Sequence, residues 1–175
     1  MKTEEITIEK VDKMVDGLSE TIRYLYAVGE FPFKIGTIQS FLGQALVAQK
    51  YLMEGKKVWW IYPEADLKIE DIGTVEVKSA KMWEDGSANI FNVKVAQFDV
   101  LCIVVLKDGK TVQKIISIPE KELEGLPNEH KSTAGNGKHP FLWVYTELAL
   151  KQYFAKGREI YDIERDIAAG KYDWQ

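Results

Sequence analysis

The chain has 175 residues, of which 46% are hydrophobic and 29% are charged, and its formal net charge at pH 7 is -4. This length suits one domain with a sizeable core, and we expect residues 1–175 to fold as a single domain. The acidic balance counts against binding of nucleic acid by bulk electrostatics. It does not exclude a nuclease, because a site that gathers carboxylates for divalent cations is acidic by construction.

The sequence predicts neither a signal peptide nor a membrane span. Residues 1–7 lack the apolar stretch of a signal peptide, and no apolar run reaches the ~20 residues needed to span a bilayer. The longest run, Val100–Leu106, has the length of a strand. It contains the single cysteine, Cys102, for which a buried and inert thiol is expected. We therefore expect a cytoplasmic protein that does not associate with membranes.

Two helices are predicted at the start of the chain. Apolar residues at three- and four-residue steps indicate an amphipathic helix over residues 9–28. The Gly29–Gly36 stretch, which contains Pro32, ends this helix. A second helix is expected from Thr37 to Glu54, with Gly55 at its end.

The periodicity then changes to that of strands. A short strand is predicted at Val58–Tyr62, followed by the strands Asp66–Ile69 and Thr74–Ala80 around a turn at residues 70–73. A loop and a short helix are expected over residues 81–97. The apolar segment Phe98–Leu106 is typical of a strand covered on both faces.

The second half of the chain begins with a hairpin and ends with helices. An Asp-Gly turn at residues 107–110 leads into a predicted strand, Thr111–Ile118, and a short helical turn follows Pro119. Residues 123–140 are polar and glycine-rich and are expected to form a loop, and helices are expected at 141–156 and 159–169. The element order predicts an α/β (α+β) fold, a mixed β-sheet with helices packed on it.

The first hairpin carries the candidate chemistry. Glu76 and Lys78 alternate along their strand and share one face, which by itself fits a solvated face of a half-buried strand. Asp66 lies ten positions before Glu76 across a tight turn, so the two carboxylates should lie near each other. Two such carboxylates repel unless a cation lies between them, and Mg²⁺ favours oxygen ligands of this kind. Lys78 is placed to hold an attacking water or to offset charge on a phosphate.

These residues resemble a known motif. Asp66, Glu76 and Lys78 form the pattern Asp-x9-Glu-x-Lys, which is similar to the motif of the PD-(D/E)xK nuclease superfamily. The family's core order of helix, three strands, helix and strand can be followed over residues 37–106. The resemblance covers about residues 36–118 and implies a restriction-endonuclease-like sheet flanked by helices. The N-terminal helix and the helices at 141–169 are then additions to this core.

The resemblance also implies an activity. A member of this family would be a metal-dependent DNA endonuclease that hydrolyses phosphodiester bonds. Asp66, Glu76 and the backbone carbonyl of Val77 would hold Mg²⁺, for which Mn²⁺ substitutes, and Lys78 would position the attacking water. Gln44 takes the place of a glutamate that many members carry on the first core helix. The implied partner is branched or duplex DNA, and a homodimer is expected because cutting two strands needs two sites.

Two departures from the family pattern leave alternatives open. Pro63 is not adjacent to Asp66, and Gln44 offers an oxygen ligand without a negative charge. A nuclease fold that serves as a catalytically silent binding or assembly module is therefore the second hypothesis. A third is an α/β interaction protein with an accidental Glu-x-Lys. Asp71 is the reserve candidate for the metal-binding aspartate, and Glu64 is a residue that would assist.

Overall fold

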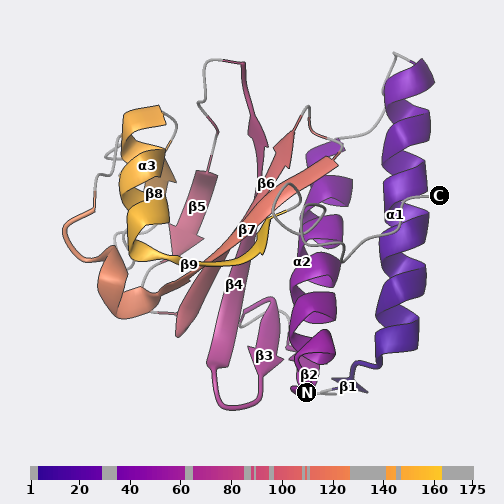
Figure 1. The fold of residues 1–175 in the computed structure, drawn as a ribbon, viewed down its shortest axis with the longest axis horizontal. Coiled ribbons are helices and arrows are strands. Elements are labelled where there is room, and N and C mark those ends of the chain that lie inside the picture. The colour runs from indigo at the N-terminus through magenta and orange to yellow at the C-terminus, as the bar shows by residue number, and fades with distance from the viewer. Residues whose placement is uncertain are drawn as a thin grey trace.

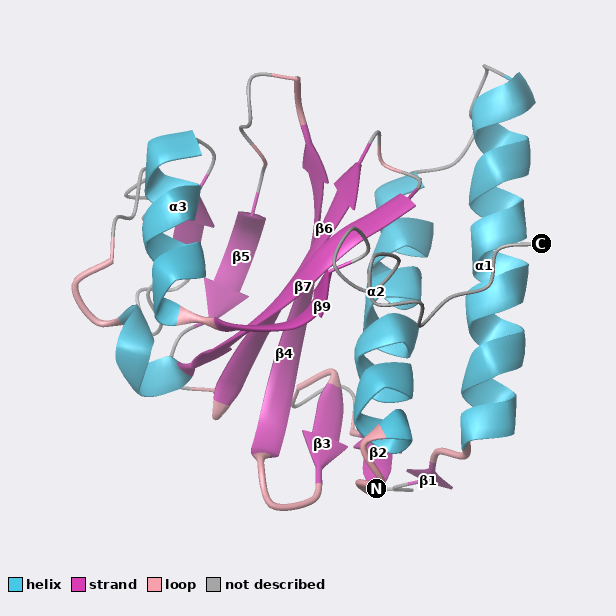
Figure 2. Ribbon diagram, in the orientation of Figure 1, coloured by secondary structure: helices cyan, strands magenta, loops and turns pink. Residues whose placement is uncertain are grey.

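The computed structural model describes residues 4–28, 35–61, 65–84, 88, 90–94, 97–107, 109, 111–126, 141–144 and 147–162. Within these residues the protein is a mixed α+β structure (Figures 1 and 2). A seven-stranded sheet has the order β1-β2-β3-β4-β6-β7-β9, and β5 and β8 form a separate pair. The predicted mixed sheet with helices packed on it is therefore confirmed. None of the described helices is both long and apolar enough to cross a membrane.

The helices and strands have the following bounds. The helices are α1 (Ile8–Val28), α2 (Ile35–Met53), a 3-10 helix (Glu120–Leu123) and α3 (Glu147–Lys156). The strands are β1 (Glu4–Glu5), β2 (Val58–Trp60), β3 (Leu67–Ile69), β4 (Gly73–Met82), β5 (Ile90–Lys94), β6 (Val100–Lys107), β7 (Thr111–Pro119), β8 (Phe141–Val144) and β9 (Arg158–Asp162).

The centre of the main sheet is the parallel pair formed by β4 and β6. Val75 lies opposite Val100 and Met82 lies opposite Lys107, so the two strands are paired over eight residues. Strand β3 pairs antiparallel with both β2 and β4, and β6 pairs antiparallel with β7. Every residue of β6 except Lys107 is buried, as the continuous apolar run predicted.

The two faces of this sheet are covered by different elements. Helix α2 packs on one face and α1 packs on α2, while α3 lies on the other side (Figure 1). Val75 and Val77 of β4 belong to the core cluster on the α2 side, and Ala80 belongs to the cluster on the α3 side. Because side chains alternate along a strand, Glu76 and Lys78 share the face of Ala80.

The helix expected within residues 81–97 is not present in the described part of that segment. It contains β5 instead, which pairs antiparallel with β8. Ile90 and Val93 of β5 are buried in the cluster on the α3 side. The helix predicted from residue 141 is also wrong at its start, because residues 141–144 form β8 and α3 begins at Glu147. Each of these strands depends on a partner about 50 residues away, which local periodicity does not reveal.

The second C-terminal helix, predicted at 159–169, is wrong over its first residues. The chain forms β9 there, which extends the sheet beside β7 and buries Ile160 in the cluster on the α2 side. The unpaired backbone groups at the edge of β7 favour a strand at this place. Residues 163–169, and residues 127–140 of the expected loop, lie outside the described residues. The sheet is thus wider than the expected core, because β1 and β9 extend it at both ends.

The remaining elements follow the predictions closely. Helices α1 and α2, the β3–β4 hairpin, the β6–β7 hairpin and the turn after Pro119 all begin within two residues of their predicted places. Cys102 is free and buried, and burial raises the pKa of its thiol to about 12. An inert thiol was expected, and the raised pKa agrees with that.

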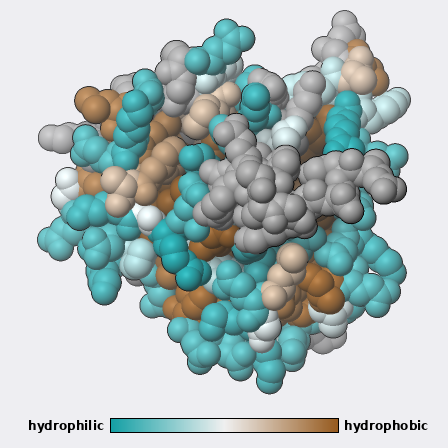
Figure 3. All heavy atoms as spheres, in the orientation of Figure 1, coloured by the Kyte–Doolittle hydropathy of each residue, from teal (hydrophilic) through white to brown (hydrophobic). Residues whose placement is uncertain are grey.

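The turn between β3 and β4 is held by backbone geometry and by one carboxylate. Asp71 and Gly73 have positive φ values of 61° and 102°. The Asp99 carboxylate accepts hydrogen bonds from the Thr74 amide at 2.7 Å and from the Thr74 hydroxyl at 2.8 Å. These bonds tie the start of β6 to the start of β4. Figure 3 shows that this end of the molecule, at the bottom of the view, is mainly hydrophilic.

We predict that Gly73→Ala destabilises the protein by more than about 1 kcal/mol. An alanine at a positive φ is strained, and its Cβ would collide with the Asp99 carboxylate. Gly17→Ala is the matched control, because Gly17 is exposed within α1 and has no neighbouring atom in the way. That change should stabilise by about 0.5–1 kcal/mol. Urea unfolding measures both, and equal effects of the two substitutions would contradict the role of the turn.

Candidate functional site

Asp66 lies where β4 extends beyond its neighbour. Strand β3 pairs only with residues 73–75 of β4, although β4 continues to Met82. Just beyond the end of this pairing, Asp66 Oδ2 accepts a hydrogen bond of 2.8 Å from the backbone amide of Val77. The carboxylate therefore takes the place that a strand carbonyl would occupy in a longer β3.

The carbonyl of Val77 faces the same edge of the sheet. In a strand, the N–H and C=O groups of one residue point toward the same neighbour, and the N–H of Val77 points to Asp66. Among the described residues, no strand pairs with residues 76–81 of β4 on this side. The Val77 carbonyl and the Asp66 carboxylate thus lie at the same stretch of the β4 edge, where no described strand pairs with β4.

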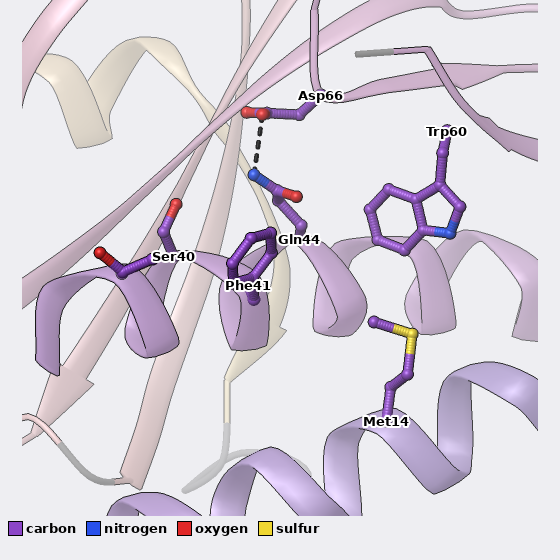
Figure 4. Close-up of a pocket in the computed structure, with 7 residues that line it drawn as sticks. Met14, Ser40, Phe41, Gln44, Trp60 and Asp66 are labelled. Carbon is purple, nitrogen blue, oxygen red and sulfur yellow. Dashed lines mark hydrogen bonds between the residues drawn. The ribbon is translucent and has the colours of Figure 1, made fainter. Parts of the chain in front are cut away.

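Helix α2 contributes Gln44 to this place. The Gln44 side-chain nitrogen donates a hydrogen bond of 2.8 Å to Asp66 Oδ1 (Figure 4). Both oxygens of Asp66 therefore accept a hydrogen bond from protein. Gln44 and Asp66 also line a cavity of about 550 Å³. Its other lining residues are Met14, Thr37, Ser40, Phe41 and Trp60.

Glu76 and Lys78 form an ion pair on the next residues of β4. Lys78 Nζ lies 2.6 Å from Glu76 Oε1, and the side chains are only 24% and 18% exposed. The pair is therefore largely shielded from water, which differs from the solvated face that the sequence also allowed.

The electrostatics connect Asp66 with this ion pair. Burial raises the pKa of Asp66 from 3.8 to about 6. The Val77 amide opposes this rise, the negative charge of Glu76 adds to it, and the positive charge of Lys78 opposes it. Asp66 thus lies within electrostatic reach of both members of the ion pair. Burial thus raises the free energy of the ionised Asp66 carboxylate, and a nearby cation would lower it.

The other residues that the sequence singled out lie apart from this place or cannot be described. Asp71 is in the turn, with its side chain 80% exposed and 3.6 Å from Lys56, so the structure does not bring it to Asp66. Glu64 lies outside the described residues. The sequence did not identify the residues of α2 beside Gln44 as part of a site. Thr37, Ser40, Phe41 and Gln44 recur at helical spacing, and this stripe was the available signal.

Comparisons with known proteins do not suggest a function, so a function has to be inferred from the geometry of the site. No model of a known protein family matches the chain, and no curated protein matches its sequence. Among the described residues, no three side chains of Asp, Glu, His or Cys gather closely enough to hold a metal ion. The oxygen atoms at and near Asp66 belong to its own carboxylate, the Glu76 carboxylate, the Val77 carbonyl and the Gln44 amide.

We predict that Asp66→Asn stabilises the metal-free protein at pH 7.5 by about 1–2 kcal/mol. The folded chain binds the Asp66 proton more tightly than the unfolded chain, so the free energy of unfolding falls as pH rises from about 4 to above 6. Asparagine does not ionise, so this loss of stability disappears. Its oxygen still accepts the Val77 amide hydrogen, although its nitrogen no longer accepts the bond from Gln44.

Urea unfolding at pH 4.5 and 7.5 measures the effect, which should shrink at the lower pH. Asp71→Asn is the matched control, since an exposed ion pair contributes little to stability. An Asp66→Asn protein that is no more stable than the wild type at pH 7.5 would contradict the assigned cost of burial.

Proposed function

We propose that this protein is a metal-dependent DNA endonuclease with a restriction-endonuclease-like core. The observation that carries the proposal is the hydrogen bond from the Val77 amide to Asp66, beside the Glu76–Lys78 ion pair. The order of a helix, three antiparallel strands and a strand parallel to the third supports the same proposal. The strand β5 is a departure, because the resemblance implied a helix in that segment.

The donors at the sheet edge fit a hard divalent cation. Asp66, Glu76 and the Val77 carbonyl would hold Mg²⁺ or Mn²⁺, because carboxylate and carbonyl oxygens are the ligands that these ions prefer. The partial burial of Asp66, which raises its pKa, is compatible with this fit, because a nearby cation would offset the cost of its negative charge. A bound ion would lower the pKa of a water and offset charge that develops on the scissile phosphate.

The side chains of the chain itself supply the rest of the chemistry. Lys78 Nζ lies against Glu76 and within electrostatic reach of Asp66, where it would attract a phosphate and hold the attacking water. Its limited exposure strengthens this attraction, because water screens a partly buried charge less. Cutting both strands of a duplex needs two such sites, so the proposal includes a homodimer.

Cleavage of branched, duplex and single-stranded DNA with Mg²⁺ or Mn²⁺ tests this function. We predict that Glu76→Gln and Lys78→Met each reduce the cleavage rate by about 100-fold or more. Lys68→Met is the matched control, because Lys68 is an exposed residue of the same hairpin and should leave the rate unchanged. Cleavage that persists in the Glu76 and Lys78 variants would contradict the proposed site.

A catalytically silent binding module is the second candidate. Both carboxylates already have protein partners, because Gln44 donates to Asp66 and Lys78 neutralises Glu76. In this case the polar contacts would serve to fix the hairpin, and no metal would bind. The two candidates therefore differ in whether the site takes up a cation at all.

Calorimetric titration with Mn²⁺ separates the two. A nuclease site predicts saturable binding that Asp66→Asn weakens at least about tenfold, while Asp71→Asn leaves it unchanged. Gln44→Glu should tighten the binding, because it adds a carboxylate beside Asp66. The absence of binding heat in both the wild type and the Gln44→Glu protein would favour the silent module.

A further inference from the structure

The cavity beside Asp66 is not used by the cleavage chemistry proposed above. It is lined by residues of α1, α2 and β2 together with Asp66, and its volume of about 550 Å³ falls within the range of ~300–1,000 Å³ that is usual for small-molecule sites. In Figure 4, Met14 and Trp60 lie on one side of Gln44 and Asp66, and Ser40 and Phe41 lie on the other.

The lining combines aromatic surface with hydrogen-bond acceptors. Phe41 is 51% exposed although it is a large hydrophobic residue, so its ring is available to a ligand. Trp60 adds a second aromatic ring to the same cavity. At the polar side, Gln44 uses its amide nitrogen on Asp66, and Figure 4 shows its amide oxygen directed away from that bond. The Asp66 carboxylate and the Gln44 oxygen thus present acceptors.

A nucleobase matches both kinds of surface. Every base has flat faces that stack on aromatic side chains, and adenine, cytosine and guanine carry an amino group that donates to carboxylate or amide oxygens. Asp66 belongs to both the cavity and the sheet-edge site. A nucleotide whose base enters the cavity would therefore lie beside the Asp66 carboxylate, which also accepts the Val77 amide at the sheet edge.

We propose that this cavity binds one unpaired nucleobase with an amino group, from the DNA strand that the site acts on. The proposal rests on the proposed function and names its substrate class as DNA that is single-stranded or locally unpaired. A paired base must first leave the duplex, because its faces are stacked and its edge is occupied by its partner. Extracting such a base costs a few kcal/mol, which an unpaired nucleotide avoids.

The test compares duplexes that differ at one unpaired position, which carries adenine, thymine or an abasic site. Fluorescence anisotropy with Ca²⁺ in place of Mg²⁺ measures binding by the full chain. The wild type should bind the adenine duplex about tenfold more tightly than the abasic one, which is the order expected for one stacked base. Thymine should bind less tightly than adenine, because it lacks the amino group. Equal affinities for adenine and the abasic site would overturn the proposal, and equal affinities for adenine and thymine would overturn its amino-group part.

Two variants assign the preference to the cavity. Phe41→Ala should abolish the adenine preference, and its exposed position makes the truncation compatible with folding. Tyr24→Ala is the matched control, since Tyr24 is an aromatic residue of α1 that is 68% exposed and does not line the cavity. It should retain the preference. A preference that survives Phe41→Ala, with unchanged thermal unfolding of both proteins, would overturn the proposal.

A fluorescent base and a parallel cleavage assay separate this proposal from the proposed function. With 2-aminopurine at the unpaired position, the wild type should quench the fluorescence by stacking, and Phe41→Ala should not. If Mg²⁺-dependent cleavage occurs without any base preference, the base site is overturned and the nuclease stands. If quenching and the base preference occur without cleavage, the base site is supported and the nuclease is contradicted.

Discussion

The hydrogen bond between the Val77 amide and Asp66 depends on a difference in length between two strands. Strand β3 ends after three residues while β4 continues, so the edge of β4 needs another acceptor at Val77. A carboxylate that fills this position is removed from water, and burial raises its pKa. The same geometry leaves the Val77 carbonyl at the open edge. The site is thus a consequence of where the pairing of the hairpin stops.

The surrounding sheet holds β4 in place from both sides. Parallel pairing with β6 fixes its register over eight residues, and the Asp99 carboxylate ties the two strands together where they begin. Because side chains alternate along β4, its consecutive residues lie on opposite faces of the sheet. Val75 and Val77 anchor the strand in the core beneath α2, which frees Glu76 and Lys78 to form a shielded ion pair on the other face.

The sequence predicted the parts of the fold and of the site that depend on local pattern. Helices α1 and α2 have strong apolar periodicity, and the tight turn before Gly73 fixed the register of the β3–β4 hairpin. Strands β5 and β9 escaped prediction because their partners lie far along the chain. Gln44 was assigned only through a family resemblance, and the structure now gives it a bond to Asp66. The cavity was missed because it depends on how α1 and α2 pack.

The central proposal is that Asp66, Glu76 and the Val77 carbonyl would hold one cation at the edge of β4. A crystal structure of the protein with Mn²⁺, recorded near the manganese absorption edge, tests it most directly. The account predicts an anomalous peak within coordination distance of both carboxylates and of the Val77 oxygen, with Lys78 displaced from Glu76. A peak elsewhere on the molecule, or no peak at Asp66 at saturating Mn²⁺, would contradict it.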